Sequence, residues 1–211
     1  SLTTKKGKID QLTTKPGLID EPVELPSTDG LFWVGIGASA GGLEALREFV
    51  SNIPGSATRK KNVTYIVAQH LSPKHQSMLV QLIARETDME VHELKNGTKP
   101  KPNTMYVTPP NSDVFVDEGA LWLREPISEI SPKPSVDLFF TSMAEKIGDH
   151  AIGIILSGTG SDGAHGMRAL RAAGGITIAQ STETAKYDGI YYVIKFLLKF
   201  PEVFRLVNVG N

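Results

Sequence analysis

The chain has 211 residues, of which 40% are hydrophobic and 21% charged, so one domain with a sizeable core is expected. Its 22 basic and 23 acidic residues give a net charge of −1, which argues against a nucleic-acid partner. It contains no cysteine, which excludes disulfides, thiolate metal sites and cysteine nucleophiles. No apolar run approaches the roughly 20 residues of a membrane span, and the N-terminus lacks a signal-peptide core. We therefore expect a cytoplasmic protein without membrane insertion.

Residues 1–30 differ in composition from the remainder of the chain. They contain two Thr-Thr-Lys segments, charges of both signs and three prolines, and they show no apolar period. Such a segment buries too little apolar surface to offset the entropy lost on ordering. The composition predicts a flexible tail or linker over 1–30 and a single domain over 31–211.

From residue 31 onward, apolar runs of strand length alternate with segments of helical spacing. Two further short runs flank Asp117-Glu118-Gly119-Ala120, which predicts a β-hairpin. The fold class predicted is α/β: a doubly wound, mostly parallel sheet with helices on both faces and one antiparallel hairpin. The expected strands are 31–37, 63–68, 90–94, 104–107, 114–116, 121–123, 151–156 and 175–179, and the expected helices are 43–50, 77–85, 136–147 and 167–173.

Polar residues follow three of the predicted strands, at the carboxyl ends where parallel sheets bind ligands. Ser39 lies in GASAGG directly after the first strand, His70 follows the second, and Asp162 lies in SGTGSDG after the strand at 151–156. A serine, a histidine and an aspartate supply the nucleophile, base and orienting carboxylate of a triad. In addition, Gly37-x-Ser39-x-Gly41 matches a strand–turn–helix nucleophile elbow. The three residues together predict a hydrolase site.

Each residue also has a simpler interpretation when it is considered alone. The glycine-rich loop is compatible with close packing of a helix on a strand, His70 with a capping role, and Asp162 with an N-cap for the helix after Gly163. Helix starts near Gly41 and Gly163 would supply N–H groups for an oxyanion. The histidines and carboxylates do not match a recognised metal spacing, so no metal is expected.

Three other classes of protein are alternatives to this interpretation. In an NAD(P)-dependent short-chain dehydrogenase, the loop at 37–41 would bind the dinucleotide and Tyr191 and Lys195 would form the Tyr/Lys pair. Leu43 then replaces the third loop glycine, and the second strand lacks the carboxylate that binds ribose. In an α/β-hydrolase the triad residues follow one another in the chain as Ser, Asp, His, whereas here the order is Ser39, His70, Asp162. A non-catalytic signalling module on the same fold stays open.

Five segments resemble the catalytic domain of chemotaxis protein-glutamate methylesterases (CheB). The resemblance implies hydrolysis of γ-glutamyl methyl esters on the cytoplasmic helices of methylated chemoreceptors, with glutamine deamidation as a related activity and without a cofactor. The segments are VGIGASAGG (34–42), AQHL (68–71), ILSGTGSDGAHGM (155–167), GGITIAQ (174–180) and TAKYDG (184–189).

The resemblance assigns roles to individual residues. It implies Ser39 as nucleophile, His70 as base and Asp162 as the aspartate, with the backbone N–H groups of Ala40 and Thr159 as oxyanion donors. Residues 69–87 are similar to versions fused to a receptor methyltransferase, and many family members carry a phosphoreceiver domain. Either domain is a candidate partner in a full-length protein. Residues 190–211 depart from the family pattern.

Overall fold

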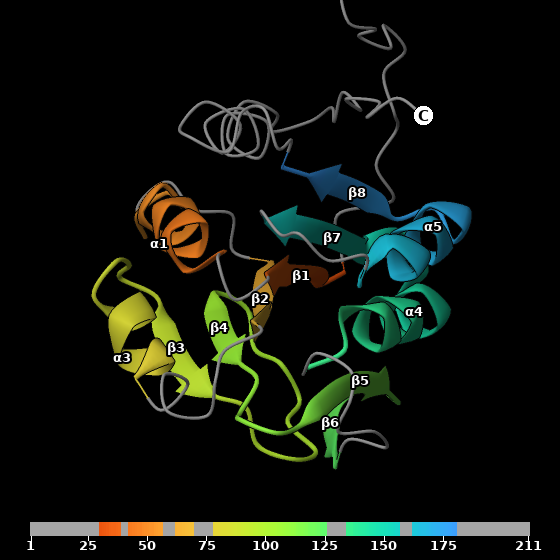
Figure 1. The fold of residues 1–211 in the computed structure, drawn as a ribbon, viewed down its shortest axis with the longest axis horizontal. Helices are drawn as coiled ribbons and strands as arrows, with labels where there is room; N and C mark the ends of the chain where they lie inside the picture. Colours follow the sequence, from red (N-terminus) through yellow and green to blue (C-terminus); the bar gives the residue numbers. More distant parts are fainter. Residues whose placement is uncertain are drawn as a thin grey trace, which may run out of the picture.

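The computed structural model describes residues 30–38, 42–56, 62–69, 78–125, 134–156 and 162–180 (Figure 1). Six parallel strands form one sheet in the order β3-β4-β2-β1-β7-β8, and β5 and β6 form a separate antiparallel pair. The predicted fold class is therefore confirmed. In chain order the elements are β1 (Phe32–Ala38), α1 (Leu43–Ser51), β2 (Val63–Gln69), α3 (Leu79–Ala84), β3 (Glu90–Glu93), β4 (Thr104–Val107), β5 (Asp113–Asp117), β6 (Ala120–Arg124), α4 (Val136–Lys146), the short 3-10 helix η2 (Gly148–His150), β7 (Ala151–Leu156), α5 (Ala164–Ala172) and β8 (Ile176–Ala179).

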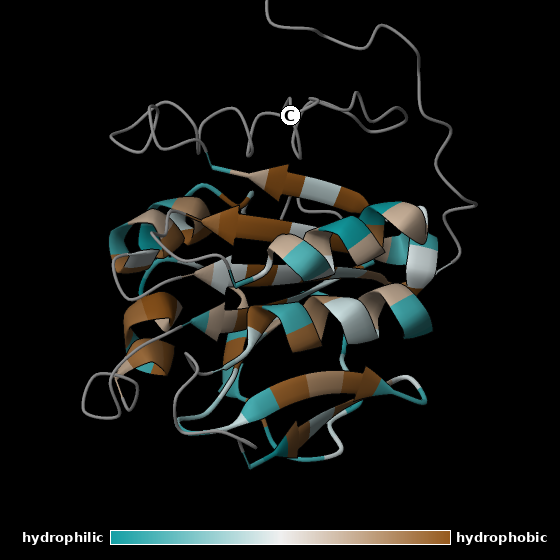
Figure 2. Ribbon diagram, turned by 45° about the vertical axis from the view of Figure 1, so that its right-hand side comes forward, coloured by the Kyte–Doolittle hydropathy of each residue, from teal (hydrophilic) through white to brown (hydrophobic). Residues whose placement is uncertain are grey.

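Helices cover both faces of the sheet, α1 and α3 on one side and α4 and α5 on the other (Figure 1). Successive strand residues alternate between the two cores: Ile36 packs with Phe49 of α1, whereas Trp33 and Ile66 pack with Phe139 of α4. Because both faces are buried, the neighbouring strands β1 and β7 carry no polar side chain along their length. This is why their sequences read as continuous apolar runs. Figure 2 shows the hydropathy of the strands and of the helices that cover them.

The first strand carries glycine where α4 crosses it. A Cβ atom on Gly35 would lie 2.7 Å from the sulfur of Met143, and one on Gly37 would lie 2.6 Å from Cγ1 of Val136. These separations are far below van der Waals contact, so α4 approaches β1 more closely than any side chain at these positions would allow. The first residue of α4 therefore lies directly against the carboxyl end of β1.

The predicted hairpin is also confirmed. Asp117 pairs with Ala120 across a two-residue turn in which Glu118 and Gly119 have φ of 46° and 71°. Left-handed conformations at both central residues match the right-handed twist of the flanking strands. The inner side of the hairpin packs on α4, where the Val116 N–H donates to Ser142 Oγ at 2.9 Å.

All the predicted strands and helices are present, with ends that shift by three residues at most. The largest shift is at the start of α5, predicted at residue 167 and found at Ala164. None of the helices in the described part of the chain has both the length and the apolar character required to cross a membrane.

Candidate active site

Three neighbouring strands end together at one edge of the sheet. Ala38, the last residue of β1, is the register partner of Gln69 at the end of β2 and of Leu156 at the end of β7. From β1 the strand order continues to β2 in one direction and to β7 in the other, so the winding reverses at this point. In open parallel sheets, ligands bind beyond the carboxyl ends of the strands at such a reversal.

The predicted site residues follow these strand ends in the chain. Ser39 comes directly after Ala38, and His70 comes directly after Gln69. The structure describes Asp162, six positions after Leu156. Ser39, Ala40, His70 and Thr159 lie outside the described residues, as do the predicted tail up to residue 29 and the Tyr191 and Lys195 of the dehydrogenase interpretation.

The Asp162 carboxylate is bound by the first turn of α4. Its Oδ2 accepts the Val136 N–H at 2.8 Å and its Oδ1 accepts the Asp137 N–H at 2.9 Å. Both donors belong to the N-terminus of an 11-residue helix, where the helix dipole favours a negative charge. The Asp162 carboxylate is thereby fixed by backbone atoms of α4.

The simpler interpretation of Asp162, an N-cap for the helix that follows it, is wrong. The N-cap of α5 is Gly163, with φ of 102° and no side-chain hydrogen bond to the helix. The Asp162 carboxylate instead accepts backbone N–H groups from the first turn of α4. Asp162 does cap a helix, but one that begins 26 residues earlier in the chain.

Three further side chains complete the hydrogen bonding around the start of α4. Ser135 Oγ accepts the Leu138 N–H at 3.3 Å, and the buried Asp113 accepts the Ser135 N–H at 2.7 Å. Asp137 Oδ1 accepts the Gly166 N–H from α5, also at 2.7 Å. Sequence reasoning missed Asp113 and Asp137. The only local indication in the sequence concerned Asp137, which is an acidic residue in the first turn of a helix and follows a serine N-cap.

Val136 connects the Asp162 turn to the end of β1. Its Cγ1 lies 2.6 Å from the position of a Cβ on Gly37 and 3.0 Å from that of a Cβ on Gly163. Gly37 and Gly163 therefore both lie against the same side chain, although they are far apart in sequence. Asp162, the neighbour of Gly163, is thus held close to the end of the strand that leads into Ser39.

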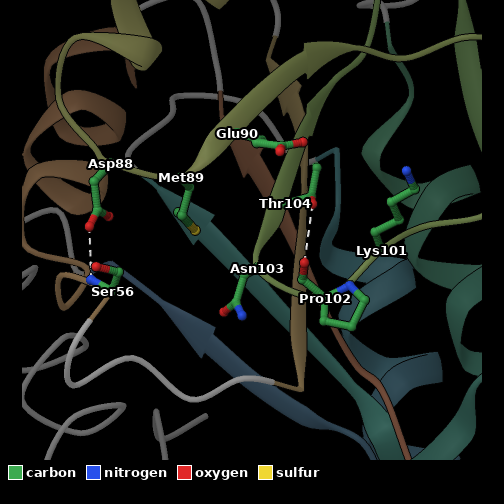
Figure 3. Close-up of a pocket in the computed structure, with 8 residues that line it drawn as sticks. All are labelled: Ser56, Asp88, Met89, Glu90, Lys101, Pro102, Asn103 and Thr104. Carbon is green, nitrogen blue, oxygen red and sulfur yellow. Dashed lines mark hydrogen bonds between the residues drawn. The ribbon is translucent and has the colours of Figure 1, made fainter.

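A cavity of about 350 Å³ lies at the other edge of the sheet (Figure 3). It is lined at the amino ends of β3 and β4 by residues that include Asp88, Glu90, Asn103 and Thr104. None of the predicted site residues lines it, so this cavity is separate from the candidate active site. His165, three residues after Asp162, is exposed on α5. Within the described ranges, no three His, Asp or Glu side chains cluster as metal ligands would.

The fold and the site define an α/β protein with a doubly wound parallel sheet and a carboxylate fixed beyond the ends of its central strands. The family model for CheB methylesterase matches residues 34–193. The chain therefore belongs to the CheB methylesterase family. A solved structure, the CheB methylesterase catalytic domain of Thermotoga maritima, is similar to this chain with a TM-score of 0.65 at 26% identity, and the match covers 79% of this chain and 88% of that one.

Two curated relatives are similar over much of the chain. The protein-glutamate methylesterase/protein-glutamine glutaminase of Desulfitobacterium hafniense (strain Y51) is 31% identical over 195 residues, which are 90% of this chain and 46% of that protein. A protein of the same name, numbered 1, from Carboxydothermus hydrogenoformans is 36% identical over 161 residues, or 74% of this chain and 46% of that protein. The chain thus spans less than half the length of these relatives.

Proposed function

We propose that this domain hydrolyses the methyl esters of glutamate side chains on the cytoplasmic helices of chemoreceptors. In this proposal Ser39 is the nucleophile, His70 the general base, and Asp162 the carboxylate that orients the base. Membership of the CheB methylesterase family supports the reaction class. The proposal covers protein-glutamate methylesterase activity in bacterial chemotaxis signalling.

The shared register of β1, β2 and β7 is the observation that carries the proposal. Ser39 and His70 are the first residues after Ala38 and Gln69, which are direct register partners on adjacent strands. Adjacent strands in a sheet lie about 4.8 Å apart, so side chains leaving the same edge at neighbouring strand ends are within reach of one another. Asp162 is anchored through Val136 to the end of the same strand β1.

The proposed reaction has two steps, acylation of Ser39 and hydrolysis of the acyl-enzyme. Ser39 Oγ attacks the ester carbonyl while His70 accepts the hydroxyl proton, and the tetrahedral intermediate expels methanol after His70 returns that proton to the leaving oxygen. His70 then deprotonates water, which attacks the acyl-enzyme, and the imidazolium returns this proton to Ser39 Oγ as the acyl bond breaks; the released carboxylic acid loses its proton to solvent. Throughout, Asp162 accepts the other imidazole N–H and so fixes the tautomer and stabilises the imidazolium.

Backbone N–H groups of Ala40 and Thr159 stabilise the oxyanion in this proposal, and no cofactor or metal is needed. The same two steps release ammonia instead of methanol when the substrate is glutamine. The two curated relatives carry both activities in their names. Ammonia release from receptor glutamines is therefore a second activity by which the proposed site can be assayed.

The test is methanol release from a methylated chemoreceptor cytoplasmic fragment. Ser39→Ala should lower turnover on the order of 10⁴-fold or more with the fold retained, and His70→Ala by a similar factor. Asp162→Asn should lower it on the order of 10³- to 10⁴-fold, because the imidazole loses its orienting acceptor. Near-full activity in Ser39→Ala would show that the nucleophile is another residue.

The extent of the catalytic unit is a separate part of the proposal. We place it within residues 31–211, because β1 begins at Phe32 and the family match begins at residue 34. Removal of residues 1–28 should leave methanol release and the melting temperature nearly unchanged. A fall of several degrees would show instead that the removed segment packs on the domain.

A further inference from the structure

Asp137 contacts the Asp162 segment at two points. Its backbone N–H donates to Asp162 Oδ1 at 2.9 Å, and its own carboxylate accepts the Gly166 N–H at 2.7 Å. Asp162 and Gly166 lie four residues apart, on either side of the left-handed turn at Gly163. The segment that carries the orienting carboxylate is therefore attached to α4 at both of its ends.

We propose that Asp137 is a positioning residue for ester hydrolysis. Its carboxylate fixes the start of α5 against the first turn of α4 and so sets the direction in which the Asp162 carboxylate accepts the imidazole N–H. This inference rests on the proposed function, since it assumes that Asp162 orients the base. Asp137 itself contacts backbone atoms and is not assigned any contact with substrate.

Two attachments constrain the carboxylate more than one does. The bonds from the α4 backbone hold the Asp162 end of the segment, and the Gly166 bond adds a second fixed point four residues further on. Catalytic groups displaced by about 1 Å can lose up to 10²-fold in rate, so such a constraint has a measurable consequence.

The helices α4 and α5 approach each other closely at the point where the Gly166 N–H meets the Asp137 carboxylate. A Cβ atom on Gly166 would lie 2.5 Å from Cβ of Phe140 and 3.1 Å from the Asp137 carbonyl oxygen. Only glycine lets the two helices come together so that the Gly166 N–H reaches the Asp137 carboxylate. The hydrogen bond to Asp137 therefore depends on glycine at position 166, next to the turn that contains Asp162.

The experiment compares Asp137→Ala, Asp137→Asn and Asp88→Ala in the methanol-release assay. Asp137→Ala removes the acceptor and should lower kcat about 10- to 100-fold with KM little changed. Asp137→Asn keeps an oxygen acceptor for the Gly166 N–H and should recover most of the rate. Asp88 is the matched control, because its carboxylate accepts the Ser56 N–H at 2.8 Å at the opposite edge of the sheet; Asp88→Ala should leave kcat unchanged.

Each remaining outcome overturns the inference. An unchanged kcat in Asp137→Ala would show that the bond is structural only, and an Asp137→Asn variant as slow as Asp137→Ala would show that the negative charge matters instead. If Asp137→Ala does not fold, Asp137→Glu carries the test: it keeps the charge but displaces the acceptor by one methylene, and should be about 10-fold slower in kcat. Asp162→Ala separates the two proposals. If Asp162→Ala is fully active, the proposed triad is wrong. If Asp162→Ala is inactive while Asp137→Ala keeps full activity, only the proposed role of Asp137 is wrong.

Discussion

On one face of the sheet, a pair of side chains connects α1 with the turn that follows α3, whereas on the other face carboxylates that accept backbone N–H groups connect α4 with α5 and the residues just before it. Arg47 donates to Glu86 Oε1 through Nη2 at 2.6 Å and through Nε at 2.9 Å, with the two side chains 39% and 23% exposed. By contrast, Asp162 and Asp137 each accept hydrogen bonds from backbone N–H groups of the opposing segment.

The two kinds of connection constrain position differently. A partly exposed ion pair between long side chains adapts to small displacements of the elements that carry it, and such a pair contributes modestly to stability. A carboxylate on a short side chain that accepts backbone N–H groups fixes one main chain relative to another. The face that fixes Asp162 is the one with backbone connections, which is what the proposed orienting role of Asp162 requires.

The largest effect should come from removing a buried aromatic side chain on each face. Phe140 and Phe49 are both fully buried, and each change to Ala should lower the free energy of unfolding by about 3–5 kcal/mol. Phe140→Ala should be the more costly, because Phe140 packs against Gly35, Gly153 and Gly166, which offer no side chain to fill the space. Urea unfolding of both variants measures the difference. Equal costs would contradict the closer packing of the α4 face.

A smaller effect should follow from adding one methyl group at the contact between α4 and α5. Gly166→Ala forces the helices apart and should lower the free energy of unfolding by about 1–3 kcal/mol. Gly55→Ala is the control, because the nearest atom to its added Cβ, Asp88 Oδ2, is 3.8 Å away. The control should change stability by less than about 1 kcal/mol. Methanol release should fall only in Gly166→Ala; an active, stable Gly166→Ala would show that the close approach is dispensable.

A third comparison concerns the polar connections themselves. Asp113 is buried, and its removal in Asp113→Ala leaves the Ser135 N–H without this acceptor, at a cost of about 1–3 kcal/mol. Glu86→Gln on the other face should shift the urea midpoint less, because the pair it weakens is partly exposed. A larger shift for Glu86→Gln would reverse the comparison between the two faces.

The sequence was sufficient to predict the elements, because both faces of the sheet are covered and its strands therefore stand out as largely apolar runs such as β1 and β7. The hairpin followed from Glu118-Gly119, whose left-handed conformations are those a two-residue turn requires. The position of β4 between β2 and β3 did not follow, since apolar runs of similar character do not specify which neighbour they pair with. That choice depends on packing between distant segments.

For the candidate site, the sequence located Asp162 beyond a strand end, and only the simpler alternative, a cap for α5, named the wrong helix. An aspartate before a glycine and a helix is the usual local pattern for an N-cap, so local rules favour α5. The actual donors, Val136 and Asp137, lie 26 and 25 residues away in the chain. No local pattern indicates which distant helix start a side chain will meet.

The smallest effect should come from the ion pair between the hairpin and the end of α4. Lys146 Nζ lies 2.8 Å from Asp117 Oδ1, and this hydrogen bond lowers the pKa of Asp117 and raises the pKa of Lys146. A lowered pKa of Asp117 contributes stability above the ordinary Asp value of about 3.9, and the contribution is lost as the pH falls through the pKa of the folded protein. The raised pKa of Lys146 contributes below about 10.4 and is lost as the pH rises through its folded value.

The pair should therefore stabilise the hairpin between about pH 4 and pH 10. We expect Asp117→Asn to have a slightly lower urea midpoint than the wild type at pH 7, with a difference that shrinks as the pH falls through the pKa of Asp117 in the folded protein. Lys99→Met removes an exposed lysine from the loop between β3 and β4 and is the control, with an expected urea midpoint at pH 7 equal to that of the wild type. A midpoint difference for Asp117→Asn that does not shrink as the pH falls would show that it arises from packing of the hairpin and not from the charge of Asp117.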